Sequence, residues 1–237
     1  MSRPGEGVSS EDFEFAALSE ARNYRAKLLE DFSAYLRGGV LEVGAGIGQI
    51  TKELSKVRSI HRLLSIEPDP SFCERIRFNL PHHELVEGTI ADLEAGGDWN
   101  AILSINVLEH IEQDEKELAE YSRVLHRTNG ALCLFVPARP EIYAPIDKDF
   151  GHFRRYTRVE LKRKLERNGF QIVKLRYYNL AGYFAWWLSF CLLKNRAFNV
   201  SAVRLFDRAV FPVVHALESH VCPPPFGQSL LAIALAK

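Results

Sequence analysis

The chain has 237 residues, of which 47% are hydrophobic and 25% are charged, a composition typical of globular proteins. Its 30 basic and 30 acidic residues give a formal net charge of zero, so the charge balance does not call for nucleic acid as a partner. The first ten residues have no apolar core, which argues against a signal peptide, and no apolar stretch is long enough to span a bilayer. The four cysteines form no C-x-x-C pair, so we expect reduced thiols, no metal site and a cytoplasmic location.

The N-terminal region is predicted to be a short tail followed by helix. Residues 1–10 are small and polar, and we expect a flexible tail there. Ser10 precedes Glu11 and Asp12, a pattern that favours a helix start because a hydroxyl caps free amides and acids suit the positive end of a helix. Apolar residues then recur at helical spacing, which predicts a helical cap over residues 11–38.

From residue 39 onward, short apolar runs alternate with amphipathic stretches. The runs are dense in aliphatic residues without strict alternation, as in parallel strands covered on both faces. Two helix starts are explicit, Asp69-Pro70 and the capping box from Thr157 to Glu160, whose helix is expected to end at Gly169. We therefore predict an α/β fold with a doubly wound, mostly parallel, seven-stranded sheet and N-terminal helices. The strands are expected at 40–43, 63–67, 83–87, 101–105, 131–137, 170–178 and 229–236.

One domain is expected over residues 1–237, with a core at 39–178 and the last strand within 229–237. Residues 179–228 form a long helical insertion between the last two strands, and insertions of this length are usually functional. Its segment 180–193 is apolar and aromatic but too short to span a membrane. Three roles stay open for it: a lid over an acceptor pocket, a homodimer surface, or a peripheral membrane contact.

A glycine loop follows the first strand and precedes a helix. Gly44-Ala45-Gly46-Ile47-Gly48 allows a tight turn and close approach of a ligand to the backbone. The next strand ends in Glu67, about 20 residues later, where a carboxylate can accept both hydrogen bonds from an adenosine ribose. The alternative is a tight turn beside a solvated glutamate, but the coincidence of both features favours a nucleoside site.

The loop is unlike a nicotinamide fingerprint. In G-x-G-x-x-G the third glycine allows close helix packing, but here Gln49 occupies that position and Gly48 comes one residue early. Glu42, just before the loop, is unfavourable beside a pyrophosphate but favourable beside a sulfonium or ammonium group. Both departures favour a ligand that has no phosphates and carries positive charge.

The segment V-L-E-V-G-A-G-I-G, residues 40–48, resembles the first motif of class I S-adenosylmethionine-dependent methyltransferases. Further similar segments follow in order at 87–92, 105–111, 125–137 and 169–173. The nearest look-alikes are the small-molecule enzymes of ubiquinone-biosynthesis type, also called methyltransferase type 11. The resemblance implies a Rossmann-like fold, S-adenosyl-L-methionine as cofactor, and methyl transfer to a small-molecule or lipid-linked acceptor.

The same resemblance implies which residues surround the cofactor. They are Tyr24, Glu42, Gly44, Ala45, Gly46 and Gly48 near the methionine part, Glu67 and Pro68 at the ribose, Gly88, Thr89 and Ile90 at the adenine, and Asn106 and Val107 after the fourth strand. Thr89 departs from the family, which often has an aspartate there to accept from the adenine amine. Tyr24 has a second interpretation as a core side chain of an amphipathic helix.

Candidates for the chemistry follow strands four and five. His110 and His152 are possible general bases, since an unperturbed imidazole titrates near neutral pH. Residues 147–156 resemble a D-x-x-x-G-H-x-R-R-Y stretch that walls the acceptor pocket in a bacterial subset of these enzymes. By that resemblance the acceptor contacts are Tyr143, Asp147, Arg154, Arg155 and Tyr156, with the two arginines gripping a carboxylate or phosphate. The alternatives are a histidine that packs the cofactor loop, a histidine that caps a turn, and two solvated arginines.

Two other classes of protein remain as alternatives. One is a nicotinamide-dependent oxidoreductase, which Gln49 and Glu42 disfavour. The other is a cofactor-binding interaction protein without turnover.

Overall fold

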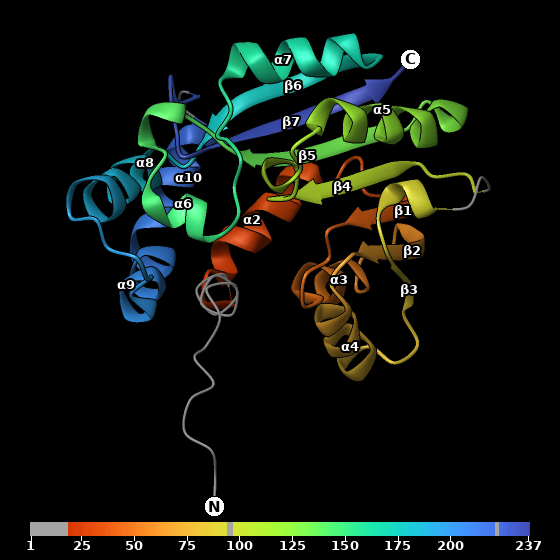
Figure 1. Cartoon of the computed structure of the whole chain (residues 1–237), viewed down its shortest axis with the longest axis horizontal. Helices are drawn as coiled ribbons and strands as arrows, with labels where there is room; N and C mark the ends of the chain where they lie inside the picture. Colours follow the sequence, from red (N-terminus) through yellow and green to blue (C-terminus); the bar gives the residue numbers. More distant parts are fainter. Residues whose placement is uncertain (1–18, 94–96, 221–222) are drawn as a thin grey trace, which may run out of the picture.

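A seven-stranded sheet runs through the middle of the protein, in the order β3-β2-β1-β4-β5-β7-β6 (Figure 1). The computed structural model describes residues 19–93, 97–220 and 223–237. The strands are β1 (Gly38–Val43), β2 (Ile60–Glu67), β3 (Glu84–Glu87), β4 (Ala101–Ile105), β5 (Ala131–Pro137), β6 (Phe170–Tyr178) and β7 (Ser229–Ala236). β7 lies antiparallel between β5 and β6, and the pairs among the first five strands are parallel. The predicted doubly wound fold and its seven strands are therefore confirmed.

Helices cover both faces of the sheet. They are α2 (Arg22–Phe32), α3 (Gln49–Leu54), α4 (Pro70–Asn79), α5 (Asp114–Leu125), α6 (Pro145–Asp149), α7 (Arg158–Arg167), α8 (Leu180–Trp186), α9 (Val200–Leu205) and α10 (Phe211–His220). Short 3-10 helices include η1 (Ile90–Asp92) and η2 (Leu108–His110), while η5 (Trp187–Leu192) and η6 (Phe206–Val210) are π-helices that continue α8 and α9. Among the described residues, no helix is long and apolar enough to cross a membrane.

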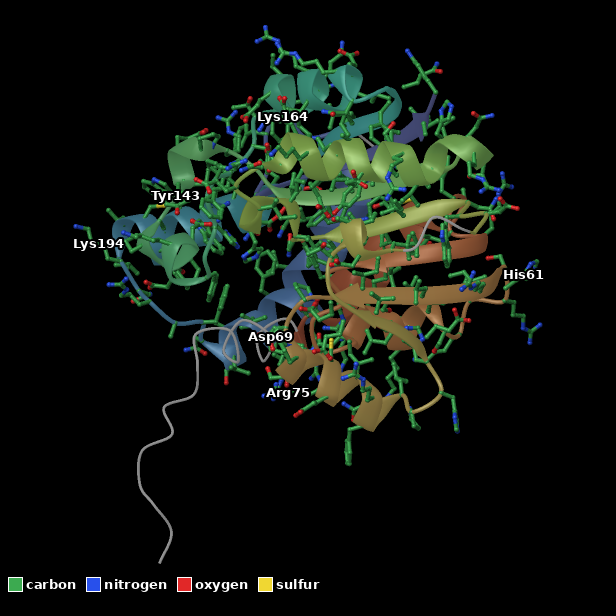
Figure 2. The ribbon with its side chains drawn as sticks, turned by 45° about the vertical axis from the view of Figure 1, so that its right-hand side comes forward. His61, Asp69, Arg75, Tyr143, Lys164 and Lys194 are labelled. Carbon is green, nitrogen blue, oxygen red and sulfur yellow. The ribbon has the colours of Figure 1, made fainter. Side chains whose placement is uncertain are left out.

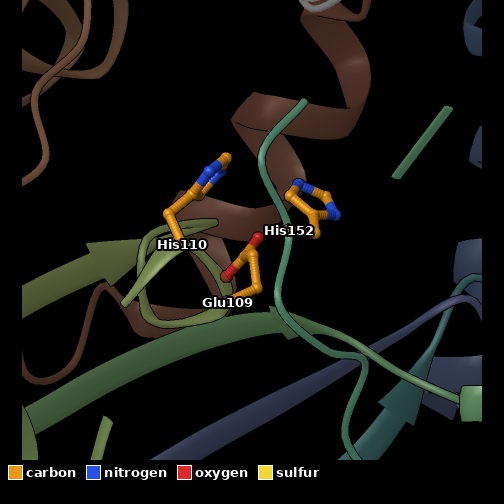
Figure 3. Close-up of side chains that lie close together, drawn as sticks. All are labelled: Glu109, His110 and His152. Carbon is orange, nitrogen blue, oxygen red and sulfur yellow. The ribbon is translucent and has the colours of Figure 1, made fainter. Parts of the chain in front are cut away.

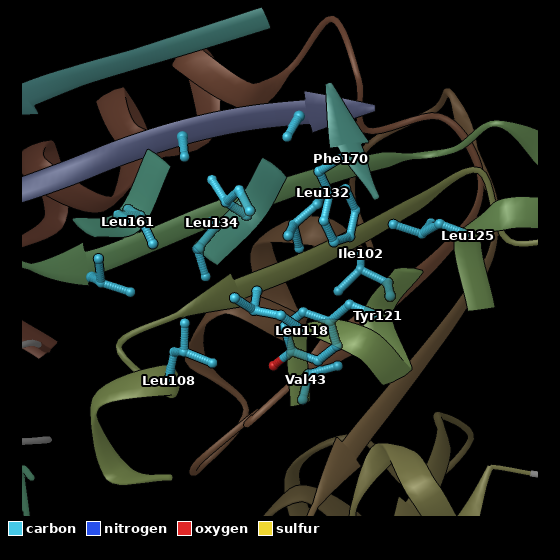
Figure 4. Packing of buried hydrophobic residues seen from close by; sticks show 14 of the residues in the cluster. Val43, Ile102, Leu108, Leu118, Tyr121, Leu125, Leu132, Leu134, Leu161 and Phe170 are labelled. Carbon is cyan, nitrogen blue, oxygen red and sulfur yellow. The ribbon is translucent and has the colours of Figure 1, made fainter. Parts of the chain in front are cut away.

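Two apolar layers hold the sheet and its helices together. On one face, Leu118 and Tyr121 of α5 and Leu161 of α7 pack with strand residues such as Ile102 and Leu134 (Figure 4). On the other face, α2, α3 and α10 cover a second cluster that contains Leu28, Phe32, Leu54, Phe135 and Phe211. Because both faces are covered, the central strands are apolar on both sides, which explains the continuous hydrophobic runs in the sequence.

Local signals in the sequence set several helix ends. The Asp69 carboxylate accepts hydrogen bonds from the amides of Ser71 and Phe72, which caps α4 as predicted. The Thr157 hydroxyl accepts from the Glu160 amide at 3.1 Å and caps α7, and Gly169, with φ of +82°, follows that helix. The predicted tail at 1–10 and the Ser10 cap lie outside the described residues. So does Cys222, whereas Cys73, Cys133 and Cys191 are free thiols.

The insertion between β6 and β7 contains α8, η5, α9, η6 and α10. These helices gather at one end of the molecule, on the left in Figure 1, away from β1, β2 and β3. Two buried acids hold the insertion in place: Asp207 joins it to α2, and Glu218 of α10 joins the end of the insertion to its beginning. Asp207 accepts from the amides of Asn23 and Tyr24, and Glu218 accepts from the amides of Asn179 and Leu180. The insertion therefore supplies capping carboxylates to the first turns of both α2 and α8.

Candidate active site

The glycine loop joins β1 to α3 at the carboxyl end of the sheet. Gly44 has φ of +73°, and a Cβ atom built on it would lie 2.3 Å from Cγ2 of Val107. The loop after β1 therefore packs directly against the loop after β4, and only a residue without a side chain fits at Gly44. This contact brings Gly44 and Val107, two of the predicted cofactor residues, together.

Glu67 is buried at the end of β2 and faces the glycine loop. Its carboxylate accepts a hydrogen bond from the Gly46 amide at 2.7 Å and another from the Asp69 amide at 3.0 Å. Pro68 lies in the chain between Glu67, which ends β2, and Asp69, which caps α4. The predicted ribose-binding acid and the predicted glycine loop are thus in direct contact, at the edge where open α/β sheets bind ligands.

Glu42 lies beneath the loop, between β1, β2 and α3. Both the Thr51 and the Ser65 hydroxyls donate to its Oε2 atom at 2.6 Å. Burial, together with the nearby Glu67 carboxylate, raises the pKa of Glu42 from its ordinary 4.5 to about 7, although the two hydrogen bonds lower it. The Glu42 carboxyl is therefore bound by hydroxyl groups inside the fold.

The segment after β3 forms a closed turn. The amide and the hydroxyl of Thr89 both donate to Oδ2 of Asp92, at 2.8 and 2.9 Å, and together they cap η1. Gly88 precedes this turn with φ of +155°. Ile90 is fully buried in the core. The Thr89 hydroxyl is engaged within its own turn, so the aspartate that the family often has at this position finds no direct counterpart here.

A cavity of about 370 Å³ opens beside the loops after β4 and β5. Predicted site residues that line it are Tyr24, Asn106, His152 and Arg155. Lining residues that the sequence did not single out are Glu109, Asn179, Asp207, Gln228 and Ser229, together with the apolar Trp186, Phe190 and Phe198 of the insertion. The insertion thus forms a wall of the cavity. Apolar walls with a few converging polar groups are typical of small-molecule sites.

His152 is the buried polar centre of this cavity. Its Nδ1 atom lies 3.0 Å from Oδ1 of Asp147, and Arg155 donates to the same carboxylate oxygen at 2.8 and 2.9 Å. The Arg155 guanidinium also lies over the Trp186 ring, 4.3 Å from its centroid. With Nδ1 held as the donor to Asp147, Nε2 of His152 is left as an acceptor. Among the described residues, no hydrogen bond reaches that buried Nε2 atom.

Glu109 and His110 lie next to His152. The rings of His110 and His152 meet edge to face with centroids 4.6 Å apart, and the Glu109 carboxylate points between them (Figure 3). Burial and the neighbouring His152 lower the pKa of His110 to about 4, against a hydrogen bond to the Phe150 backbone, so this imidazole is neutral at pH 7. One atom from each of the three side chains lies within 4.8 Å of the others. Two imidazoles and a carboxylate are donors that a first-row transition metal accepts, although the sequence predicts no metal site.

The D-x-x-x-G-H-x-R-R-Y stretch divides between the cavity and its surroundings. Asp147, His152 and Arg155 converge there. Arg154 instead pairs with Asp114 at 2.9 Å and does not line the cavity. Tyr156 is fully buried and donates to Asp114 at 2.9 Å and to the Leu108 carbonyl at 3.1 Å. The Tyr143 hydroxyl donates to the His152 carbonyl at 2.7 Å, so Tyr143 supports the backbone of the histidine.

Tyr24 occupies the boundary between core and cavity. Its ring packs edge to face with Phe135 and Tyr178, and its hydroxyl bonds to Ser229. Burial raises the pKa of the Tyr24 hydroxyl, so it stays protonated at neutral pH. Tyr24 thus belongs to the apolar layer under the sheet and also lines the cavity, and its contact with the cofactor stays a prediction.

Comparisons with known proteins agree on one family. Residues 41–134 match the sequence model of the family described as "Methyltransferase domain". No curated protein sequence matches the chain. The solved N-methyltransferase NodS from Bradyrhizobium japonicum, in complex with S-adenosyl-l-homocysteine, is 15% identical with a TM-score of 0.58, over 91% of this chain and 86% of its own. The TehB-like SAM-dependent methyltransferase from Corynebacterium glutamicum is 18% identical with a TM-score of 0.54, over 98% of this chain and 90% of its own.

A third solved structure, the S-adenosylmethionine dependent methyltransferase from Mesorhizobium loti, is 14% identical with a TM-score of 0.58, over 85% of this chain and 92% of its own. At these identities the structural likeness establishes the fold, and the sequence match at 41–134 covers the glycine loop, Glu67 and the loop after β4. The chain is therefore similar to the methyltransferase domain over residues 41–134 and shares the fold of these solved methyltransferases.

Proposed function

We propose that the protein transfers a methyl group from S-adenosyl-L-methionine to a small-molecule or lipid-linked acceptor held in the cavity. The observation that carries the proposal is that the glycine loop and the cavity adjoin each other at the loop after β4. Gly44 packs on Val107, and the neighbouring Asn106 lines the cavity. A cofactor on the glycine loop and an acceptor in the cavity would therefore meet at the ends of β1 and β4.

The residues at the glycine loop fit this cofactor. The amide of Gly46 in the glycine loop donates to Glu67, a buried acid at the position suited to ribose hydroxyls. Glu42 adds negative charge below the loop when it is ionised, which favours a cationic ligand. The cofactor, when bound, supplies an electrophilic methyl group on a sulfonium. The chain's own residues then have to orient the acceptor and accept its proton.

His152 is the residue that we assign to proton transfer. Asp147 fixes its Nδ1 as a donor, and Nε2 is left as a buried acceptor at the cavity. As the acceptor atom takes up the methyl group, its proton passes to Nε2. Arg155 holds the Asp147 carboxylate ionised, since its guanidinium, together with hydrogen bonds from His152 and the Ala144 amide, keeps the pKa of Asp147 below its ordinary value despite burial. His110, neutral beside it, is the second candidate for the proton.

Equilibrium binding tests the cofactor half of this proposal. The wild-type protein should bind S-adenosylmethionine in calorimetry, and Glu67→Ala should weaken that binding. The matched control is Glu87→Ala, at the end of the neighbouring strand β3, where the side chain is exposed and pairs with Arg77. No binding by the wild type, or equal binding by both variants, would contradict the assignment. Tight NADH binding in its place would favour an oxidoreductase.

Labelled methyl transfer tests the acceptor half. The protein is incubated with methyl-labelled S-adenosylmethionine and a cell extract separated into aqueous and lipid fractions. Label in a low-molecular-weight or lipid product supports the proposal and shows which fraction holds the acceptor. Label only in protein or nucleic acid would contradict it. We further propose a cytoplasmic location, which the free thiols of the described residues favour.

A further inference from the structure

The outer face of α8 and η5 is apolar and exposed. Phe184, Trp187, Leu188, Leu192 and Leu193 have exposed fractions of 54%, 45%, 48%, 56% and 61%. We call these five side chains the apolar ridge. The opposite face of the same helix carries Trp186 and Phe190, which are buried and line the cavity. One helix thus separates the cavity from the ridge.

The exposed charges that the insertion itself contributes are of one sign. Residues 180–220 contain two acids, Asp207 and Glu218, and both are buried and accept backbone hydrogen bonds. The exposed charges of the segment are cationic. Arg196 and Arg204 are matched by Asp149 and Glu20 from outside the segment, and Arg208 lies near the same Glu20. Both Lys194 and Arg208 are exposed. Lys194 directly follows the ridge and lies at the outer edge of the insertion (Figure 2).

We propose that the apolar ridge, with Lys194 and Arg208, docks the protein on the surface of an anionic lipid bilayer. Aromatic and aliphatic side chains can enter the acyl boundary while the adjacent cations meet lipid phosphates. The exposed surface of the insertion offers no acid that anionic headgroups would repel, and this charge complementarity favours a bilayer over a mixed-charge protein partner. No described helix can cross a membrane, so the contact is an interfacial one.

Other apolar side chains of the insertion are exposed as well. Leu205, Val213 and Leu217 are exposed by 67%, 61% and 55% on α9 and α10. Their spacing places Val213 and Leu217 on one helical face. The proposal rests on the apolar ridge and does not require these three side chains.

If the apolar ridge contacts lipid, only the helix formed by α8 and η5 separates the cavity from the membrane surface. This consequence rests on the proposed function: a lipid-linked acceptor would reach His152 past α8 and η5 without leaving the membrane surface. The binding itself does not depend on methyl transfer, so the test is made with the protein alone, in the absence of cofactor.

Vesicle sedimentation tests the proposal. The full chain should pellet with vesicles of phosphatidylcholine containing phosphatidylglycerol, and less with pure phosphatidylcholine. The double variant Trp187→Ser/Leu188→Ser should bind at least about tenfold more weakly. The matched control is Phe78→Ser on α4, which removes an apolar side chain that is 87% exposed but lies outside the insertion.

Charge reversal tests the cationic part. Lys194→Glu/Arg208→Glu should lower affinity for the anionic vesicles by at least about fivefold, while Arg58→Glu/Lys116→Glu, with the same net change in charge, should have little effect. Failure of the wild type to pellet with anionic vesicles overturns the proposal. The proposal is also overturned if the wild type is a dimer in ultracentrifugation, the variant Trp187→Ser/Leu188→Ser is a monomer, and both bind vesicles equally well. A protein that binds vesicles but not S-adenosylmethionine would keep the docking surface and refute the proposed function.

Discussion

Asp147 orients the imidazole of His152, and this orientation determines which nitrogen of His152 can accept a proton. Because Nδ1 lies 3.0 Å from the Asp147 carboxylate, Nε2 is the atom left to face an acceptor. His152→Ala should lower kcat by about 10²–10⁴-fold, the usual loss for a general base, and leave affinity for S-adenosylmethionine unchanged. The measurement is the pH–rate profile together with calorimetric cofactor binding.

Thr157→Ala is the control for that substitution. It removes a helix cap and should cost about 1 kcal/mol of stability with little change in kcat. Full activity of His152→Ala between about pH 6 and pH 9 would reject the role of His152 as a general base. Alignment of the substrates, or proton transfer to His110, would then explain the rate.

Glu42 links the stability of the fold to pH. Its pKa is about 7 in the folded protein against an ordinary 4.5, so between these values the folded state keeps a proton that the unfolded chain has released. The contribution of Glu42 to the free energy of unfolding should therefore fall as pH rises from 4.5 towards 7, by about 3 kcal/mol, and stay constant above that.

Urea denaturation at about pH 5 and about pH 8 measures this effect. Glu42→Gln should lack the decline, so the wild type should lose stability relative to the variant as pH rises. Glu53→Gln, on the surface of α3, is the control and should decline as the wild type does. Equal slopes for the wild type and Glu42→Gln would show that Glu42 titrates normally.

At the scale of elements, α2 and the insertion are joined through Asp207. Its buried carboxylate accepts from the amides of Asn23 at 3.0 Å and Tyr24 at 2.9 Å, in the first turn of α2. Asp207→Ala should therefore cost about 2 kcal/mol of stability, since two half-buried helix amides lose a buried carboxylate acceptor. It should also speed amide exchange in the first turn of α2, which carries Tyr24 to the cavity.

Asp69→Ala is the matched control for the capping role. Asp69 also accepts from two amides, but it caps α4 at the protein surface, so its loss should cost about 1 kcal/mol and leave exchange in α2 unchanged. Urea denaturation and hydrogen-exchange mass spectrometry on both variants give the comparison. An Asp207→Ala protein no less stable than Asp69→Ala would contradict the linking role of Asp207.

For the whole molecule, the sequence predicted what local patterns encode. Aliphatic runs marked all seven strands, because a strand buried on both faces must be apolar throughout. The proximity of Gly46 and Glu67 followed from parallel topology, which collects the carboxyl ends of strands at one edge. The roles of neighbouring arginines were not separable. Arg155 faces Asp147 and Arg154 faces Asp114, and which side each takes depends on how the extended segment crosses the helices around it.

The contacts of the insertion could not be read from the sequence either. Asp207 and Glu218 meet partners that are far away along the chain, at Tyr24 and Asn179. Composition identified the insertion as apolar and aromatic but left three roles open. Only its packing shows that one face lines the cavity while the other presents the apolar ridge.

The position of β7 has a consequence for the order in which the chain can assemble. β6 pairs with β7 in the sheet, and β7 in turn pairs with β5, although β7 is the last of the three in the chain. During synthesis, β1 to β5 can form their parallel ladders before β7 is made. β6 and the insertion cannot join the sheet until β7 is present. Until then the edge of β5 is open and the aromatic insertion is undocked. A nascent chain of this topology therefore passes through an aggregation-prone intermediate with an exposed strand edge. The sheet is completed only when β7 pairs with both β5 and β6.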